Sequence, residues 1–471
     1  MFEVTYTQTT FNRDYKEQFR KQAETASRRA SEMCVKVFQL KIQDNKLNET
    51  QKKFLHDLFL EAKWWYNDCI AFGKESEENK PWKNDCKKKS VVHYDKDKNP
   101  IESELQFLSS ASKQEINKRI GTSCRSISTN LKKGNIQHTK GLQFKSEFNS
   151  VPFRQFGNSW KFKGNKIKLQ NCSKPIKVNG LEQLLIDGIE FANANLIQKA
   201  SGYYLQITCY VPKEKPKEKS EKAYQTIGLD FGCDKTVTGY VEETNKSFKL
   251  NYRCEQPENQ KRTQRKMSRR QSKGFSNRSN KGLRLQKQNR KQYEHQNNQK
   301  NDRSNKIIHD LKDYGMIVMQ NEMLSRWQKS GHGKAVTHGI LGRLKTRIEK
   351  LPNSYVLDSS YPTSKFCFDC FHKKRDLKLW DRTFVCPNCG SVSDRDVHAS
   401  KNMVHFMHLE QMVPTEIHRE PKRLKKFVLE LLNDIEKRVE TNSSESIESI
   451  VLSCIQELSE KHEAVSLHGK R

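Results

Sequence analysis

The sequence predicts a multidomain α+β protein. A small β-barrel with an inserted helical region comes first, followed by an α/β domain that carries an inserted metal-binding ribbon. Three observations indicate this class: a change from helical to strand periodicity within the first 212 residues, strand–helix alternation after residue 226, and two Cys-x2-Cys pairs between residues 367 and 389. A length of 471 residues suggests about two to four domains. The charged, proline-containing stretch 212–222 is the best boundary between them.

The composition indicates a polyanionic partner. There are 87 Lys and Arg against 56 Asp and Glu, which gives a formal charge of +31. Such a charge favours DNA, RNA or an anionic membrane surface. No run of about 18 apolar residues is present, so we expect no membrane span. Among these polyanions we expect nucleic acid and no membrane as the partner. The first ten residues, MFEVTYTQTT, lack the apolar core of a secretory signal. Thirteen scattered cysteines also argue against a disulfide-built secreted protein.

The N-terminal third is expected to begin with helix and strand. Residues 1–36 are polar and basic and predict a helical extension. A short strand at 35–42 follows. Asn48 and Gln51 then have the spacing of a capping box, which predicts the start of a core-packing helix with apolar side chains at helical intervals.

Residues 75–104 are charged and poor in apolar side chains, so we expect a loop there. A second helix is predicted at 105–133. Between 142 and 212 the pattern changes to short basic strands, with Gly164-Asn165 at a hairpin turn. Such strands predict a small barrel of the kind that can hold an oligonucleotide, although a purely structural barrel has the same pattern.

The C-terminal half predicts an α/β sheet. A strand at 226–231 has two expected antiparallel partners at 236–243 and 248–253. An apolar strand at 314–320 and an amphipathic helix at 337–350 follow. An antiparallel meander that continues into strand–helix alternation suggests a core of the RNase H type.

A basic run lies within this half. Residues 261–290 hold 12 Lys and Arg and no acidic residue. An isolated helix of this composition repels itself, whereas a phosphate backbone removes the repulsion and releases counterions. The simpler alternative to a nucleic-acid contact is that these residues form a helix face exposed to solvent. The candidate nucleic-acid-binding residues are Lys261, Arg262, Arg265, Lys266, Arg269, Arg270 and, further along the chain, Arg343.

The strongest local motif is a pair of knuckles. Cys367 and Cys370 are followed, after fifteen residues, by Cys386 and Cys389, with Gly390 next. Four thiolates in this spacing close a tetrahedral Zn²⁺ shell. Because all four ligands come from the protein, we expect a structural zinc ion that replaces a hydrophobic core for about thirty residues.

Three carboxylates occupy comparable positions on separate elements. Asp230 ends the strand TIGLDFG, Glu322 follows the strand GMIVMQN, and Asp394 and Asp396 open a helix after the second knuckle. Each alone also fits a turn, a surface glutamate or a helix cap. Together they predict a cluster that a divalent cation neutralises, and hard oxygen ligands select Mg²⁺ or Mn²⁺. Two such ions support phosphodiester hydrolysis.

These motifs resemble a known family. The order IGLDFG, IVMQN, CxxC…CxxCG and DRDVHASKNM is that of the split RuvC nuclease of TnpB proteins, which bacterial insertion sequences encode. Miniature type V-F CRISPR effectors are similar to them. The resemblance covers roughly residues 37–409 and is densest over 226–403.

The resemblance implies an RNA-guided DNA endonuclease with Asp230, Glu322 and Asp396 as its first, second and third metal-binding acids. Asp396 is favoured over Asp394 because the family's acid directly precedes an x-Asn-Ala-Ala stretch. The chain departs from the family pattern at three positions: Met323 in place of Asp, His398 in place of Asn, and Ser400 in place of Ala.

The resemblance also implies cofactors and partners. We expect two Mg²⁺ or Mn²⁺ ions, one structural Zn²⁺, a guide RNA encoded by the same element, and double-stranded DNA beside a short flanking motif. A monomer in the nucleoid-associated cytoplasm of a prokaryote is expected, and a dimer would favour the CRISPR effector. The implied parts are a basic extension (1–36), a wedge barrel (37–215) with a helical recognition insert (about 48–135), RuvC segments I and II (216–360) with a basic helical insert (256–311), a target-nucleic-acid-binding zinc ribbon (361–392), RuvC segment III (393–409) and a polar tail (410–471).

Three other functions fit part of the pattern. A type V-F effector has the same chemistry, and neighbouring DNA, either a transposon end or a repeat array, distinguishes it from TnpB. A nuclease-dead RNA-guided repressor would have lost one acid, whereas this chain keeps all three. A zinc-ribbon transcription factor would not explain Asp230 or Glu322.

Overall fold

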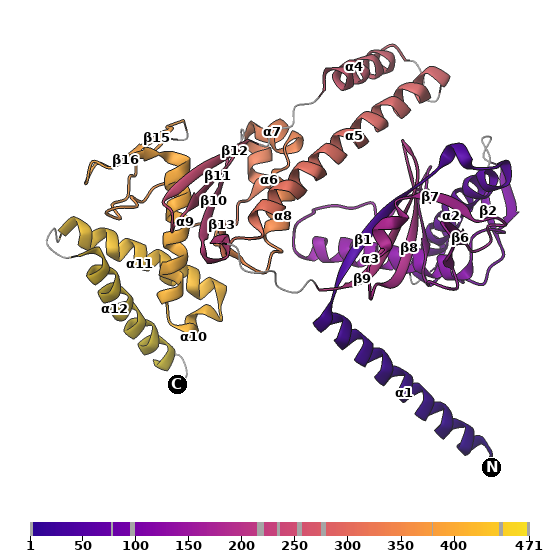
Figure 1. Ribbon diagram of the computed structural model, residues 1–471, viewed down its shortest axis with the longest axis horizontal. Coiled ribbons are helices and arrows are strands. Elements are labelled where there is room, and N and C mark those ends of the chain that lie inside the picture. Colours follow the sequence, from indigo (N-terminus) through magenta and orange to yellow (C-terminus); the bar gives the residue numbers. More distant parts are fainter. Residues whose placement is uncertain are drawn as a thin grey trace. The chain divides into compact units, whose positions relative to one another are not determined.

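The computed structural model describes residues 3–76, 79–94, 99–213, 221–232, 236–251, 257–274, 279–378, 380–441 and 446–468. Its contacts divide the chain into two compact units, Met1–Lys215 and Pro216–Arg471. The division falls within the charged stretch that the sequence marks as a boundary (Figure 1).

Unit 1 is built on an antiparallel, barrel-like sheet. The strand order is β4-β8-β9-β1-β7-β6-β5, and β4 and β5 form its two edges. The predicted hairpin is present, and Gly164 takes a φ of 58° at its turn, a backbone conformation that glycine adopts readily. The strands are β1 (Met33–Ile42), β4 (Ser150–Phe153), β5 (Trp160–Lys163), β6 (Lys166–Leu169), β7 (Ile176–Asn179), β8 (Glu190–Lys199) and β9 (Gly202–Pro212).

Helices cover this sheet and extend from it. The extension forms α1 (Glu3–Glu32). Helix α2 (Glu49–Glu75) starts with the predicted capping box of Asn48 and Gln51. Helix α3 (Ser110–Lys132) begins later than the sequence pattern suggests. Short 3₁₀ turns are η1 (Asp44–Lys46), η2 (Pro81–Lys83), η3 (Leu181–Leu184) and, in unit 2, η4 (Glu221–Tyr224).

The loop predicted at 75–104 is wrong in part. Its described residues include a hairpin of β2 (Ser90–Tyr94) and β3 (Pro100–Glu104). Val91 of this hairpin is buried in the core of unit 1, and the ring of His93 stacks on Trp64 of α2 with a centroid distance of 4.1 Å. The contact joins residues far apart in sequence, so local composition did not indicate it.

Unit 2 contains a mixed sheet of order β12-β11-β10-β13-β14. The first three strands form the expected antiparallel meander, and β13 and β14 continue parallel to β10. The strands are β10 (Thr226–Phe231), β11 (Thr236–Val241), β12 (Lys246–Asn251), β13 (Met316–Gln320) and β14 (Ser354–Leu357).

Helices lie on both faces of this sheet. Side chains of α5 (Asn280–Leu311) and α8 (Leu341–Ile348) pack with Ile227 and Leu229 on one face. Helix α9 (Arg395–Met412) packs on the other face, against β10 and β11 (Figure 1). The single helix predicted at 337–350 is interrupted at Gly339, a poor helix former. The remaining helices are α4 (Glu258–Ser272), α6 (Leu324–Trp327), a π-helical turn η5 (Gln328–His332) and α7 (Gly333–His338).

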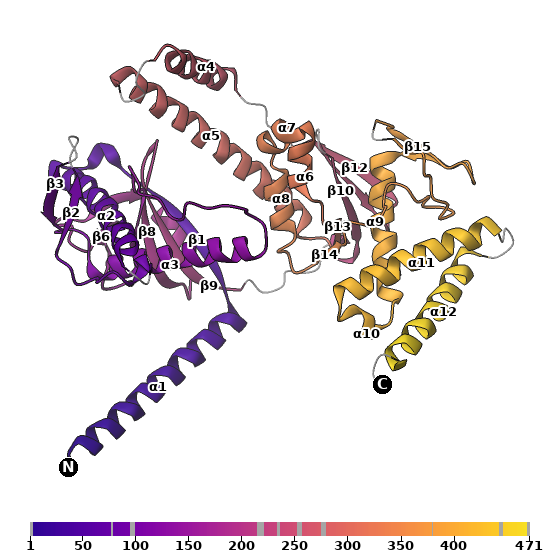
Figure 2. The same cartoon turned by 180° about the vertical axis from the view of Figure 1, so that it is seen from behind.

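The segment after α9 is part of the hydrophobic core. Helices α10 (Thr415–His418), α11 (Pro421–Thr441) and α12 (Ile447–His468) follow, and α11 and α12 form a hairpin (Figure 2). Phe427 and Leu431 are fully buried in one cluster with Phe406 of α9. The segment predicted as a polar tail (410–471) therefore also has an apolar side, because the apolar stripe of α11 packs on α9. Within the described residues, no helix is both long and apolar enough to cross a membrane.

Candidate active site and zinc ribbon

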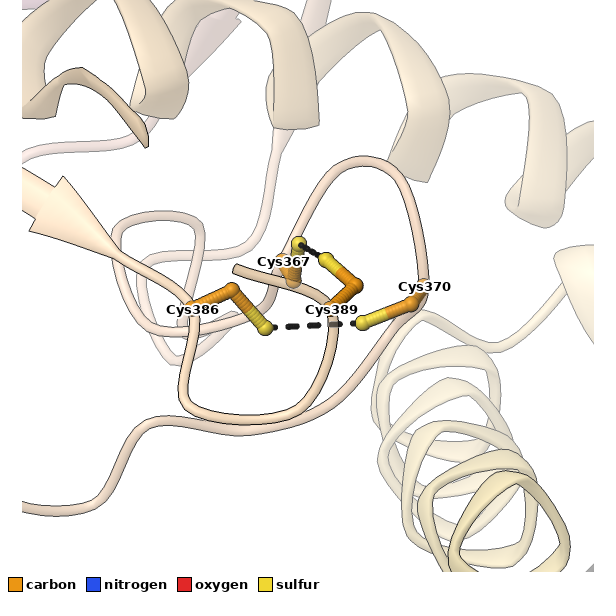
Figure 3. Close-up of side chains that lie close together, drawn as sticks. All are labelled: Cys367, Cys370, Cys386 and Cys389. Carbon is orange, nitrogen blue, oxygen red and sulfur yellow. Dashed lines mark hydrogen bonds between the residues drawn. The ribbon is translucent and has the colours of Figure 1, made fainter. Parts of the chain in front are cut away.

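The four cysteines of the two knuckles meet at one point. Their sulfur atoms all lie within 4.8 Å of one another. Cys367 Sγ is 3.6 Å from Cys389 Sγ, and Cys370 Sγ is 3.5 Å from Cys386 Sγ (Figure 3). A tetrahedral ion with Zn–S bonds of about 2.3 Å separates its sulfurs by about 3.8 Å. The cluster therefore fits a structural Zn²⁺ ion.

The ribbon around these cysteines has little core of its own. Strands β15 (Thr383–Val385) and β16 (Val392–Asp394) pair across it. Its buried cluster consists of Cys367, Cys386 and Phe384, with two partly buried neighbours. Burial raises the pKa of the Cys370 thiol to about 11, so metal binding must displace protons. Gly390 completes the second knuckle with a φ of 72°.

The three predicted acids come from three elements of unit 2. Asp230 lies near the end of β10, Glu322 lies two residues beyond β13, and Asp396 is in the first turn of α9. Burial, followed by the charges of Asp396 and Glu322, raises the pKa of Asp230 to about 7. Burial also raises the pKa of Glu322, which Lys345 partly opposes. The structure thus brings the carboxylates of Glu322 and Asp396 within electrostatic range of Asp230.

The acids are spaced more widely than the thiols. Across the described part of the chain, the four cysteines are the only set of three or more His, Cys, Asp or Glu side chains whose ligand atoms all lie within 4.8 Å of one another. The three acids therefore form an open cluster rather than a closed shell.

A close helix–sheet contact positions Asp396. A Cβ atom on Gly228 would lie 2.0 Å from the carbonyl oxygen of Ser400, so only glycine allows α9 to approach β10 this closely. Ser400 Oγ lies 2.9 Å from the carbonyl oxygens of both Thr238 and Asp396. Because Thr238 pairs directly with Asp230, this hydroxyl links the start of α9 to the strand beside that acid.

The two aspartates of the DRD motif have different roles. Asp394 caps α9 by accepting the N–H groups of Asp396 and Val397. Its carboxylate also accepts a 2.7 Å hydrogen bond from Lys249, and the pKa of Asp394 is lowered because these donors outweigh burial. The ammonium of Lys249 is 3.9 Å from Asp396. Lys249 was not predicted, because its partners lie 145 or more residues away in sequence.

The basic run forms α4 and the start of α5, and residues 275–278 lie outside the described residues. Arg262, Lys266 and Arg269 are exposed. Lys261 and Arg265 both pair with Glu258, and Arg270 donates to Ser279. Arg343 donates instead to Asn297 and Asn301 of α5. The structure thus gives Arg343 a packing contact, whereas most cations of α4 face solvent.

A second basic surface lies on unit 1. Lys161 is directly opposite Lys168, and Lys166 is directly opposite both Lys163 and Lys177. Alternation along β5, β6 and β7 puts these side chains on the face opposite the buried core. Like charges directly opposite each other destabilise a sheet. The charge of Lys46 lowers the pKa of Lys177 most, its hydrogen bond and burial come next, and the charge of Lys166 adds least. We call these five strand lysines the lysine face.

A family model matches the ribbon, and two solved structures match longer parts of the chain. The family described as Cas12f1-like, TNB domain, matches residues 351–403, which include all four cysteines and Asp396. No curated protein sequence matches the chain. A cryo-EM structure of a Cas12f1–sgRNA–target DNA complex is 12% identical, covers 79% of this chain and 98% of its own, and has a TM-score of 0.43.

A cryo-EM structure of a CRISPR–Cas12f ternary complex is also 12% identical, covers 63% of this chain and 70% of its own, and has a TM-score of 0.25. Because both TM-scores are low, the family model that matches the ribbon is the comparison that identifies part of this chain. Residues 351–403 therefore carry a Cas12f1-like TNB domain.

Proposed function

We propose that this protein is an RNA-guided DNA endonuclease of the TnpB type. It cleaves double-stranded DNA beside a short flanking motif, at a single RuvC-type site. The electrostatic cluster of Asp230, Glu322 and Asp396, on three separate elements and beside a Cas12f1-like ribbon, supports this proposal. A purely structural sheet has no reason to bring three carboxylates together at a free-energy cost.

Asp230, Glu322 and Asp396 would hold the divalent ions. Their carboxylate oxygens suit Mg²⁺ or Mn²⁺. The raised pKa of Asp230 reflects burial first and then the negative charges of Asp396 and Glu322, which a cation relieves. When bound, two ions would activate water and stabilise the leaving oxygen. Lys249 keeps Asp394 as the helix cap, and Ser400 and Gly228 fix the approach of Asp396 to Asp230.

Two surfaces would bind nucleic acid through phosphates. Within α4 itself, Glu258 is the only acidic residue beside the exposed cations. The lysine face on β5, β6 and β7 retains like-charge repulsion as long as it is empty. A guide RNA is a resident partner and would relieve this repulsion throughout the life of the complex, whereas target DNA would bind only transiently.

The type V-F effector is the second candidate, because the matched ribbon family is described as Cas12f1-like. Both candidates share the same chemistry, so the genomic neighbourhood decides between them. A nuclease-dead repressor is the candidate from another class, and the presence of all three acids speaks against it.

The test uses the full chain with its copurifying RNA. That RNA is sequenced, and programmed DNA cleavage is measured in Mg²⁺ for the wild type, Asp230→Ala and the exposed control Asp302→Ala. We expect one discrete RNA species, cleavage by the wild type and the control, and no cleavage but full RNA binding by Asp230→Ala. Unchanged cleavage by Asp230→Ala, or the absence of a discrete RNA, would overturn the proposal.

A further inference from the structure

The segment that leads into the zinc ribbon is hydrogen-bonded to the strand that precedes Glu322. Gln320, which is 4% exposed, donates through Nε2 to the carbonyl oxygens of Asp358 and Tyr361, at 3.0 and 2.7 Å. Thr363 Oγ1 donates to Gln320 Oε1 at 3.2 Å. All three bonds are made by Gln320, two residues before Glu322. The conformation of residues 358–363 therefore affects the position of Glu322.

The same segment is hydrogen-bonded to α9. Asn402 Nδ2 donates to the carbonyl oxygens of Thr363 and Phe366, at 2.6 and 2.7 Å. His398 Nε2 lies 2.6 Å from the same Phe366 oxygen. Phe366 directly precedes Cys367, so the two bonds to its carbonyl end one residue before the first cysteine of the zinc site. Asn402 and His398 are each 1% exposed.

His398 also contacts the second half of the ribbon. Its Nδ1 atom lies 3.0 Å from the Ser393 hydroxyl of β16, and its ring stacks on Phe384 of β15 with a centroid distance of 3.9 Å. Phe384 belongs to the buried cluster around Cys367 and Cys386. Burial lowers the pKa of His398, and a neutral ring that donates from Nε2 and accepts at Nδ1 satisfies both bonds.

His398 is close to the candidate active site along the helix. Two residues at a rise of about 1.5 Å each separate it from Asp396 by about 3 Å along the axis. Any movement of the ribbon that breaks the bonds of His398 therefore acts on the first turn of α9, where Asp396 lies. An asparagine side chain is shorter and has no ring, so it cannot both stack on Phe384 and span Phe366 and Ser393.

We propose that the zinc ribbon and the carboxylate site are thermodynamically coupled, with His398 as the positioning residue between them. This inference rests on the proposed function, which assigns Asp230, Glu322 and Asp396 to divalent cations. A ribbon with so small a core depends on its metal for folding. Zinc binding orders the Phe366 carbonyl, Phe384 and Ser393. These groups then fix the first turn of α9 and raise the affinity of the acids for a divalent cation.

Coupling of this kind is reciprocal. If zinc tightens Mn²⁺ binding by a given factor, Mn²⁺ must tighten zinc binding by the same factor. Couplings between protein sites typically amount to about 5- to 150-fold in affinity. Both directions can be measured without any cleavage reaction.

The experiment titrates Mn²⁺ into the full-length protein and follows free Mn²⁺ by electron paramagnetic resonance. Only the binding that is lost in Asp230→Asn is counted. We expect zinc-loaded wild type to bind at least about fivefold tighter than zinc-depleted protein. His398→Ala should lose this ratio, and His398→Asn should keep part of it through the bond to Phe366. His408→Ala, on the same helix but 38% exposed, is the matched control and should keep the full ratio.

Zinc affinity is measured by competition with a chromophoric chelator, once with Mn²⁺ and once without it. The ratio of these two zinc affinities must equal the ratio of the two Mn²⁺ affinities. Equal Mn²⁺ affinity with and without zinc in the wild type would refute the coupling. A ratio of Mn²⁺ affinities in His398→Ala equal to that of the wild type would refute the role of His398. If the alanine variant does not fold, a wild-type ratio in His398→Asn refutes that role instead. Mn²⁺ binding that is unchanged by Asp230→Asn would instead refute the carboxylate site of the proposed function.

Discussion

Asp230 should destabilise the metal-free protein at neutral and alkaline pH. Burial and the neighbouring acids raise the pKa of Asp230 from 3.8 to about 7. Between these two values the folded state keeps a proton that the unfolded state has released. The contribution of Asp230 to stability therefore falls as pH rises from about 4 and is at its lowest above about pH 7. Asparagine has the same shape and no charge, so Asp230→Asn removes this dependence.

The magnitude follows from the pKa shift. Each unit corresponds to about 1.4 kcal/mol, so the full rise corresponds to about 4 kcal/mol of the free energy of unfolding. Some of this effect is already present at pH 5. The stability gained by Asp230→Asn over the wild type should therefore be about 3 kcal/mol larger at pH 8 than at pH 5.

The assay is denaturant unfolding of the metal-free protein at pH 5 and pH 8, followed by a signal from unit 2. Asp302→Asn on the exposed side of α5 serves as the control and should show no such difference. Added Mg²⁺ should reverse the order at pH 8, because it stabilises only the carboxylate form. A gain for Asp230→Asn that is the same at both pH values, or a loss at pH 8, would refute the reasoning.

Three further predictions concern the close helix–sheet approach, the metal and the lysine face. Gly228→Ala should lower the free energy of unfolding by about 1–3 kcal/mol or more, because its Cβ meets the Ser400 carbonyl at 2.0 Å; a neutral result in denaturant unfolding would contradict the close approach. Cys386→Ser should lose bound zinc in a metal assay while Cys124→Ser retains it, and zinc retention by both variants would argue against the four-thiolate shell. Replacing Lys166 and Lys177 together by Gln should raise the melting temperature of RNA-free protein. The same change should weaken RNA binding and reduce its salt slope by about 0.7–0.9 for each phosphate that is no longer neutralised, whereas Lys53→Gln should do neither. A lower melting temperature with unchanged RNA binding would mean that the lysine face is only structural.

Features that depend on neighbours in sequence were predictable. The capping box of Asn48 and Gln51 and the turn at Gly164 each involve residues within a few positions of one another, and both are present. The spacing of the four cysteines likewise predicted a single cluster. Local chemistry alone determines these features, so periodicity and motif spacing were sufficient.

Features that depend on distant segments were not predictable. Lys249 contacts Asp394 across 145 residues, and His398 contacts Phe366 across 32 residues. The sequence indicated His398 only as a departure from the family pattern and did not indicate its contacts with Phe366, Ser393 and Phe384. In the hairpin of β2 and β3, the stack of His93 on Trp64 is likewise a contact between distant segments. Such contacts exist only after the chain has folded, so they leave no periodic signal.

The packing of α11 and α12 limits how far this chain can be shortened. The three acids proposed to bind metal and the four cysteines of the zinc site all lie before residue 397, so a truncated chain could keep both sets. Removal of everything after residue 412 would nevertheless expose Phe406 and Met407 of α9, which now lie in one cluster with Phe427 and Leu431. A freshly exposed apolar surface of this kind promotes aggregation. A shorter version should therefore keep the C-terminal hairpin or replace the apolar residues of α9 that it covers.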